Sequence, residues 1–176
     1  ITFNDLDLII EGDTSIYIKE LIKVLGSERV KVIRHNTIYK TSEIIINGIK
    51  VDIASARKEN YPIPGENPIV ELSTIKNDLI RRDFNINALA IELKNNRIID
   101  LFSGLDAIYE KKIDFLHESS VLDDPTRIIR ASRYSAKLNF NLSNKALRQI
   151  QDTINLWPWN WHIGDNTDIA PSALSI

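Results

Sequence analysis

One ten-residue segment constrains the fold more than any other, because its pattern predicts a tight β-hairpin. Two β-branched runs, Ile44–Ile46 and Ile49–Ile53, flank the dipeptide Asn47-Gly48. A two-residue type I′ turn needs positive φ at both central residues, and Asn-Gly adopts that conformation readily. The sequence therefore predicts two antiparallel strands. In the second strand the β-branched residues share one face, and Asp52 points to the other.

A further strand is predicted for Phe3–Ile10, where leucines alternate with carboxylates. Side chains alternate along a strand, so Asp5 and Asp7 share one face and the two leucines share the other. Two carboxylates this close ionise together only when a cation neutralises them, and Mg²⁺ prefers oxygen ligands. If the Asp52 strand is a neighbour, three carboxylates converge, which is the minimum for a two-metal site.

The alternative that Asp5, Asp7 and Asp52 are solvated surface residues, and not metal ligands, stays open. A lone Asp-x-Asp match is usually a solvated pair on an edge strand. Asp52 is equally compatible with an exposed surface position. The apolar residues around Asp5 and Asp7 favour a buried strand, in which unpaired charges are costly.

The remaining elements alternate between strands and helices, with more helix in the second half. We expect a helix over Ile16–Leu25 that ends at Gly26, and a proline-rich loop over Tyr61–Pro68. The other expected elements are a strand over Val30–Ile33, two short helices running into a strand over Ser73–Leu93, a strand over Ile98–Phe102, a helix opened by Asp124-Pro125, and a helix from Ser143 to Leu156. The fold class predicted is α/β (α+β).

Two basic segments could bind a nucleotide. Arg81-Arg82-Asp83 with Asn87 offers donors for phosphate and acceptors for sugar hydroxyls, although that segment alone favours a salt-bridged helix face. Arg127, Arg130 and Arg133 recur every third residue on one side of a helix, without acidic partners at helical spacing. Such a stripe suits a triphosphate, and a solvated polar face is the alternative.

Composition excludes several classes of protein. The chain of 176 residues has no cysteine, so disulfides, thiolate metal sites and cysteine nucleophiles are excluded, and a reducing, cytoplasmic location is expected. The net charge of −2 gives no global basic field, so RNA would be held by local patches. No apolar run is long enough to span a membrane. The scattered histidines His35, His117 and His162 are expected to be structural or surface residues, and Trp157, Trp159 and Trp161 to be core anchors.

Five motifs, in order, resemble the class II tRNA nucleotidyltransferase and bacterial poly(A) polymerase family, which comprises CCA-adding enzymes and their CC-adding, A-adding and polyadenylating relatives. The likeness runs from about Phe3 to Phe140. The motifs are Asp5-x-Asp7, Val51-Asp52-Ile53-Ala54-x-x-Arg57-x-Glu59, Arg81-Arg82-Asp83-Phe84-x-Ile86-Asn87-Ala88, Asp100-x-Phe102-x-Gly104 and Asp123-Asp124-Pro125-x-Arg127-x-x-Arg130-x-x-Arg133.

The resemblance implies a DNA polymerase β-like nucleotidyltransferase head, with a small mixed sheet and flanking helices, over residues 1–115. Residues 116–176 would begin an all-helical neck that binds nucleotide and RNA. The Gly-Gly-x-Val-Arg-Asp loop and the strand that precede the catalytic strand in this family are absent. We therefore expect an internal fragment of a longer enzyme with little activity alone.

The resemblance also implies roles for individual residues. Asp5 and Asp7 would hold two Mg²⁺ ions, and Asp52 would help activate the primer 3′-hydroxyl. Asp124 with Arg127 would act as a protein template for cytosine or adenine. The nucleotide-binding set implied is Arg82, Asp83 and Asn87 for ribose and phosphate, Asp124 and Arg127 for the base, and Arg130 and Arg133 for the triphosphate.

The function expected is Mg²⁺-dependent nucleotidyl transfer from CTP or ATP to the 3′ end of tRNA, as CCA or partial CCA addition. Three alternatives stay open: a non-catalytic nucleotide- or RNA-binding relative, a poly(A) polymerase acting on other RNAs, and a Mg²⁺-dependent phosphohydrolase. Nucleotide choice and oligomeric state do not follow from the sequence.

Overall fold

The computed structural model describes residues 6–156. Asp5, the three tryptophans and His162 lie outside these described residues. The chain forms two compact units, of which unit 1 comprises Ile1–Glu59 and Val70–Asp78, and unit 2 comprises Asn60–Ile69 and Leu79–Ile176. The division between head and neck at residue 115 stays a prediction.

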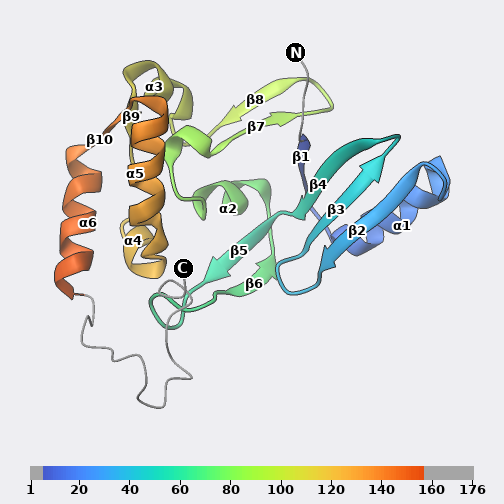
Figure 1. The fold of residues 1–176 in the computed structure, drawn as a ribbon, viewed down its shortest axis with the longest axis horizontal. Helices are drawn as coiled ribbons and strands as arrows, with labels where there is room; N and C mark the ends of the chain where they lie inside the picture. The colour runs from blue at the N-terminus through green and yellow to red at the C-terminus, as the bar shows by residue number, and fades with distance from the viewer. Residues whose placement is uncertain (1–5, 157–176) are drawn as a thin grey trace. The chain divides into compact units, whose positions relative to one another are not determined.

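Unit 1 contains a four-stranded mixed sheet in the order β1-β4-β3-β2 (Figure 1). Strand β1 is parallel to β4, and the β3 pairings with β4 and β2 are antiparallel. The predicted hairpin is confirmed, because Asn47 and Gly48 both have positive φ, at 49° and 85°. The bounds of the strands are Leu6–Ile10 for β1, Val30–Asn36 for β2, Thr41–Ile46 for β3 and Ile49–Ser55 for β4.

Helix α1 (Thr14–Leu25) covers one face of this sheet. The Asp13 carboxylate accepts from the Ser15 N–H at 2.8 Å and so caps the helix, which ends at Gly26 as expected. Burial of the apolar face of α1 against the strands stabilises the unit. Its buried core consists of Ile18, Val30, Ile44, Val51 and Ile53, with Leu8 and Ile10 packed against it.

The middle of the chain contains more structure than the sequence predicted. A short hairpin, β5 (Arg57–Asn60) with β6 (Ile69–Leu72), flanks the proline-rich loop, and neither strand was expected. The two short helices running into a strand are confirmed as α2 (Ile75–Ile80), the 3₁₀ helix η1 (Asn85–Asn87) and β7 (Leu89–Glu92).

The strand expected over Ile98–Phe102 is β8 (Arg97–Asp100), which pairs with β7 and stops earlier than predicted. The reason is the Asp100 carboxylate, which accepts the backbone N–H groups of Gly104 at 2.7 Å and Leu105 at 2.9 Å. These bonds begin a helix, α3 (Gly104–Glu110), that the sequence reading missed. A carboxylate is a strong acceptor for the free N–H groups of a helix start.

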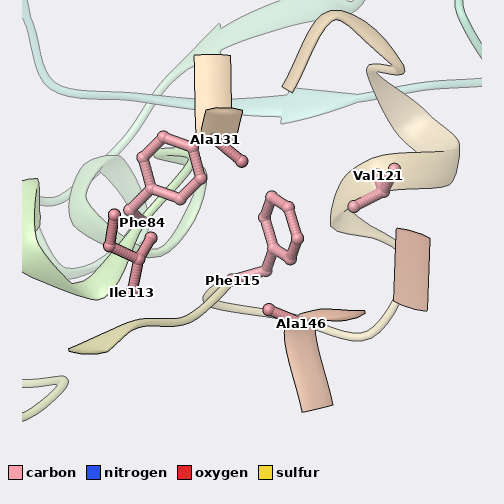
Figure 2. Packing of buried hydrophobic residues seen from close by; sticks show 6 residues of the cluster. All are labelled: Phe84, Ile113, Phe115, Val121, Ala131 and Ala146. Carbon is pink, nitrogen blue, oxygen red and sulfur yellow. The ribbon is translucent and has the colours of Figure 1, made fainter. Parts of the chain in front are cut away.

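Unit 2 has a core in which helices pack on the aromatic ring of Phe84 (Figure 2). The rings of Phe84 and Phe115 lie 5.4 Å apart, and Tyr134 meets Phe84 edge-on at 5.5 Å. The helices expected after Asp124-Pro125 and Ser143 are confirmed. The helices and short strands of this core are β9 (Lys112–Ile113), α4 (Ser120–Asp123), α5 (Thr126–Leu138), β10 (Asn141–Leu142) and α6 (Asn144–Leu156).

Within residues 6–156, none of the helices has the length and apolar character needed to cross a membrane.

Candidate functional site

The parallel pairing of β1 with β4 places Asp7 in register with Asp52. Neighbouring strands lie about 4.8 Å apart, and residues in register share a face. That face is opposite the one on which Leu8 and Ile53 pack against the core of unit 1. The expectation that the Asp52 strand lies beside the Asp-x-Asp strand is therefore confirmed for Asp7. Asp5 lies outside the described residues.

A third acid, Glu43 on β3, is the register partner of Asp52. The ammonium of Lys50 lies 3.4 Å from a Glu43 oxygen and 3.9 Å from an Asp52 oxygen, and Arg34 lies 3.8 Å from Glu43. The side chain of Asp52 is 43 % exposed, so this polar face remains accessible within unit 1. Sequence analysis did not single out Glu43, although it stands as far before the Asn47-Gly48 turn as Asp52 stands after it.

The donor set on this face fits a hard divalent cation. Asp7 and Asp52 offer carboxylate oxygens from adjacent strands, the ligand type that Mg²⁺ prefers. Glu43 is already neutralised by Lys50 and Arg34. Among residues 6–156, no group of three or more His, Cys, Asp or Glu side chains is close enough together to hold a metal ion.

In unit 2, Asp83 organises the predicted ribose- and phosphate-binding residues. Its carboxylate is nearly buried, at 7 % exposure, and accepts from Arg130 Nε at 2.5 Å and from Asn87 Nδ2 at 2.7 Å. Arg82 Nη1 donates to the Asn87 carbonyl at 3.0 Å. Burial alone would lower the pKa of Arg130, but the hydrogen bond and the charge of Asp83 outweigh it and raise that pKa. Four predicted residues thus form one connected network.

The arginine stripe on α5 was expected to lack acidic partners at helical spacing, and that expectation is wrong for Arg127. Arg130 pairs with Asp83, which lies 47 residues earlier in the chain, and Arg127 Nε lies 3.8 Å from Asp124. Helical spacing cannot reveal the first partner, because the fold supplies it. Arg133 is exposed, with its guanidinium 5.7 Å from the centre of the Tyr134 ring.

The alternative of a solvated polar face does not hold for Arg127, because this side chain is only 4 % exposed. Its guanidinium donates to the Ser120 hydroxyl and, at 2.8 Å, to the backbone carbonyl of Arg81. The Asp124 carboxylate accepts the N–H of Thr126 at 3.0 Å and so caps the first turn of α5. Asp124 and Arg127 are therefore held in place by hydrogen bonds within unit 2.

His117, which was expected to be a structural or surface residue, lies beside Arg127. His117 Nε2 lies 3.4 Å from an Arg127 nitrogen, and its Nδ1 lies 3.3 Å from the Ser119 hydroxyl and 3.9 Å from the Asp123 carboxylate. Nothing in its sequence spacing indicated this contact. Burial and then the Arg127 charge lower the pKa of His117, against the opposing effect of Asp123.

Comparison with known proteins identifies the relatives of this chain. A family model described as the poly A polymerase head domain matches residues 1–114. The A-adding tRNA nucleotidyltransferase of Aquifex aeolicus is 38% identical over 155 residues, which are 86% of this chain and 18% of that protein. The A-adding tRNA nucleotidyltransferase of Halalkalibacterium halodurans is 38% identical over 144 residues, 80% of this chain and 33% of that protein. The chain thus spans a third or less of these two relatives.

Solved structures agree with the sequence comparison. A CCA-adding enzyme in an apo form superposes with a TM-score of 0.79 at 34% identity, over 89% of this chain and 37% of that one. A tRNA nucleotidyltransferase complexed with a primer tRNA and an incoming ATP analog gives a TM-score of 0.71 at 35% identity, over 88% of this chain and 42% of that one. These values confirm the expected α/β fold with a small mixed sheet and flanking helices.

Proposed function

The chain belongs to the poly A polymerase head domain family, and on that premise we propose that it carries the groups for nucleotidyl transfer from CTP or ATP to the 3′ end of tRNA. The observation that carries the proposal is the register of Asp7 with Asp52 across a parallel strand pair. Asp7 and Asp52 would hold divalent cations on this face of the sheet, and such cations would supply charge neutralisation for nucleotidyl transfer.

Nucleotidyltransferases of this kind generally use a divalent cation, and we propose Mg²⁺ for this chain because the donors are carboxylate oxygens. Bound Mg²⁺ would neutralise phosphate charge and lower the pKa of a coordinated hydroxyl. Asp7, Asp52 and Asp5 are the ligands proposed for a two-ion site. Asp52, the third carboxylate of this proposed set, would help activate the primer 3′-hydroxyl. Their task is positioning, because in-line transfer needs the reacting groups held close and aligned.

For unit 2 we propose recognition of the nucleotide itself. Arg130 and Arg133 would bind the triphosphate, since guanidinium groups pair with phosphate oxygens through two parallel hydrogen bonds. Arg82, Asp83 and Asn87 would set the geometry for ribose and phosphate through the network that joins them. Asp124 and Arg127 would read the edge of the base. Their existing hydrogen bonds hold them before a nucleotide arrives, which reduces the cost of ordering on binding.

Nucleotide choice is the finer part of the proposal. Both relatives that are 38% identical are A-adding enzymes, and one structural neighbour was solved with an ATP analog. Another neighbour was solved with CTP, so the support for AMP transfer comes from the two A-adding relatives, and CMP transfer is the alternative. The absence of cysteine supports action in the reducing cytoplasm.

The test is an incorporation assay with the full-length protein. Three transcripts of one tRNA, ending before the CCA sequence, after its first C or after its second C, are incubated with Mg²⁺ and labelled CTP or ATP. We expect labelled tRNA and released pyrophosphate, with AMP added to the transcript that ends in CC.

The other outcomes separate the alternatives. Release of phosphate without labelled RNA would indicate a phosphohydrolase, and nucleotide binding without transfer would indicate a binding module. Long adenosine tails on unrelated RNAs would indicate a poly(A) polymerase. Each of these results would overturn the proposed function.

A further inference from the structure

His117 makes a contact to which the proposed function assigns no role. Its Nε2 lies 3.4 Å from Nη1 of Arg127, whose guanidinium is otherwise bound by the Ser120 hydroxyl and the Arg81 carbonyl. All of these groups belong to unit 2. The imidazole is therefore one of four groups that face a nearly buried guanidinium, together with the Ser120 hydroxyl, the Arg81 carbonyl and the Asp124 carboxylate.

The chemistry of the pair decides the protonation state of the ring. A guanidinium has donors only, so Nε2 of His117 can hydrogen-bond to it only through a lone pair. The ring proton then resides on Nδ1, where it faces the Ser119 hydroxyl and the Asp123 carboxylate. This contact requires a neutral imidazole. A protonated ring would place a second cation beside Arg127.

The backbone at His117 is also held in place. The His117 carbonyl accepts from Gln149 Nε2 at 2.9 Å and from the Ser120 N–H at 3.2 Å. Gln149 in turn accepts the N–H of Val121 at 3.2 Å, which ties α6 to α4. The ring thus projects from a fixed position, and its orientation is set by the groups at its two nitrogens.

The charged groups that face His117 come from two helices. Asp123 on α4 lies beside Nδ1, and Arg127 on α5 lies beside Nε2. Helix α6 contributes the neutral amide of Gln149. Asp124 faces Arg127 from the other side, at 3.8 Å from Nε. Burial and the charge of Arg127 both disfavour protonation of the ring, so the neutral form is maintained to lower pH than in a free histidine.

We propose that neutral His117 is a positioning residue for Arg127, holding its guanidinium in the orientation observed here, and that protonation of His117 releases it. The inference rests on the proposed function, because Arg127 is the residue proposed to read the base. His117 itself touches no reacting atom. Its effect should therefore appear in nucleotide binding more than in the chemical step.

The first test measures KM and kcat for CTP and ATP in the full-length protein between pH 5.5 and 8. His117→Gln keeps a neutral acceptor that does not titrate, and His117→Ala removes the acceptor. We expect His117→Ala to raise KM roughly tenfold, the effect of about 1.4 kcal/mol, with kcat nearly unchanged. Because the pKa of His117 is lowered from the ordinary 6.5, the wild-type KM should stay constant around pH 6.5 and rise only at lower pH, where the ring becomes protonated. The His117→Gln KM should not rise.

His35→Gln is the matched control, because His35 lies in unit 1 and hydrogen-bonds only to Ser15 and Ser42 in the described contacts. It should leave both KM and its pH dependence at wild-type values. His117→Ala with a wild-type KM and pH profile would overturn the inference, and so would a His117→Gln variant that keeps the wild-type pH dependence.

A second measurement does not depend on catalysis. The side-chain N–H signals of Arg127 are followed by NMR across the same pH range. In the wild type they should shift as His117 titrates, and in His117→Gln they should not. If the chemical shifts of these Arg127 signals do not change as His117 titrates, the proposed contact between the two side chains is refuted. Wild-type protein that binds neither CTP nor ATP at any pH would overturn the proposed function, and the NMR result would then show separately whether His117 holds Arg127.

Discussion

The Asp83 carboxylate lies 2.5 Å from Nε of Arg130, and this bond joins two motifs that are 47 residues apart in the chain. Asp83 is nearly buried, whereas the Arg130 side chain is 41% exposed. A buried carboxylate is costly unless it is paired, so Asp83 favours one position of the arginine strongly. The orientation of the exposed part of the Arg130 guanidinium is thereby fixed before any nucleotide binds.

Asp83→Asn should weaken nucleotide binding. The amide keeps the size of the side chain but loses the charge-assisted bond, so Arg130 is no longer held in one position. We expect KM for CTP or ATP to rise about tenfold or more and the free energy of unfolding to fall by about 1–3 kcal/mol. Steady-state kinetics and urea denaturation of the full-length protein measure the two effects. The control is Asp152→Asn, an exposed acid on α6; an equal loss there would contradict the interpretation.

Asp7→Asn and Asp52→Asn should each abolish transfer while the fold is retained. Both side chains lie on the open face of the sheet, so the core of unit 1 is untouched. Loss of a metal ligand removes several kcal/mol of charge stabilisation, and we expect incorporation to fall by about 10³-fold. Labelled-nucleotide incorporation measures activity, and Mn²⁺ titration measures cation binding. Circular dichroism checks the fold. An active Asp7→Asn variant would refute the metal role.

Phe84→Ala should destabilise unit 2 severely. The Phe84 ring is fully buried and contacts the rings of Phe115 and Tyr134 (Figure 2). Removing it leaves a cavity that the surrounding helices fill only in part, at an expected loss of about 3–5 kcal/mol in the free energy of unfolding. Ile91→Ala is the control, because Ile91 is 63% exposed and should change stability by less than about 0.5 kcal/mol. Similar losses for both variants would contradict the assigned core.

Stability should depend on the ionisation of Asp100 at acid pH. Burial alone would raise the pKa of Asp100, but the N–H groups of Leu105, Gly104 and Phe102 lower it below the ordinary 3.8. Because the folded-state pKa is the lower one, this stabilisation is complete above pH 3.8 and is lost as the pH falls through the folded-state value.

Asp100→Asn provides the comparison for that pH dependence. The variant should be less stable than the wild type by about 1 kcal/mol at pH 6, because the amide replaces the carboxylate that caps α3. The difference should shrink below pH 3.8. Urea unfolding at several pH values measures it. A difference that stays constant down to pH 2.5 would show that the charge of Asp100 does not matter.

Much of unit 1 could be predicted from local pattern. The Asn47-Gly48 turn sets the register of its hairpin, and the alternation around Asp52 places that carboxylate on the polar face. The pairing of this strand with that of Asp7 was a conditional prediction, which the sheet confirms. The position of Glu43 opposite Asp52 could have been predicted from the same hairpin register, but the sequence analysis did not consider it.

The arginines of α5 show which features local sequence pattern does not predict, namely their burial and their partners. Their spacing was interpreted as a stripe without acidic partners, yet Arg127 is buried and Arg130 is paired with Asp83. Helix α3 was missed for another reason: the sequence analysis expected only a strand over Ile98–Phe102, whereas the Asp100 side chain starts a helix at Gly104.

Turns, strand faces and helix caps are encoded by residues within a few positions of one another, so the amino-acid order alone was enough for the hairpin, the faces of Asp7 and Asp52, and the motif order that marks the family. The pairing of Asp83 with Arg130 and the bond from Arg127 to the Arg81 carbonyl formed only when segments far apart in the chain packed together. The contacts of His117 with Ser119, Asp123 and Arg127 join nearby residues, but they depend on how α4 and α5 pack. A hydrogen bond between residues far apart in the chain depends on where folding brings them, and a buried charge then takes the partner that the core leaves within reach.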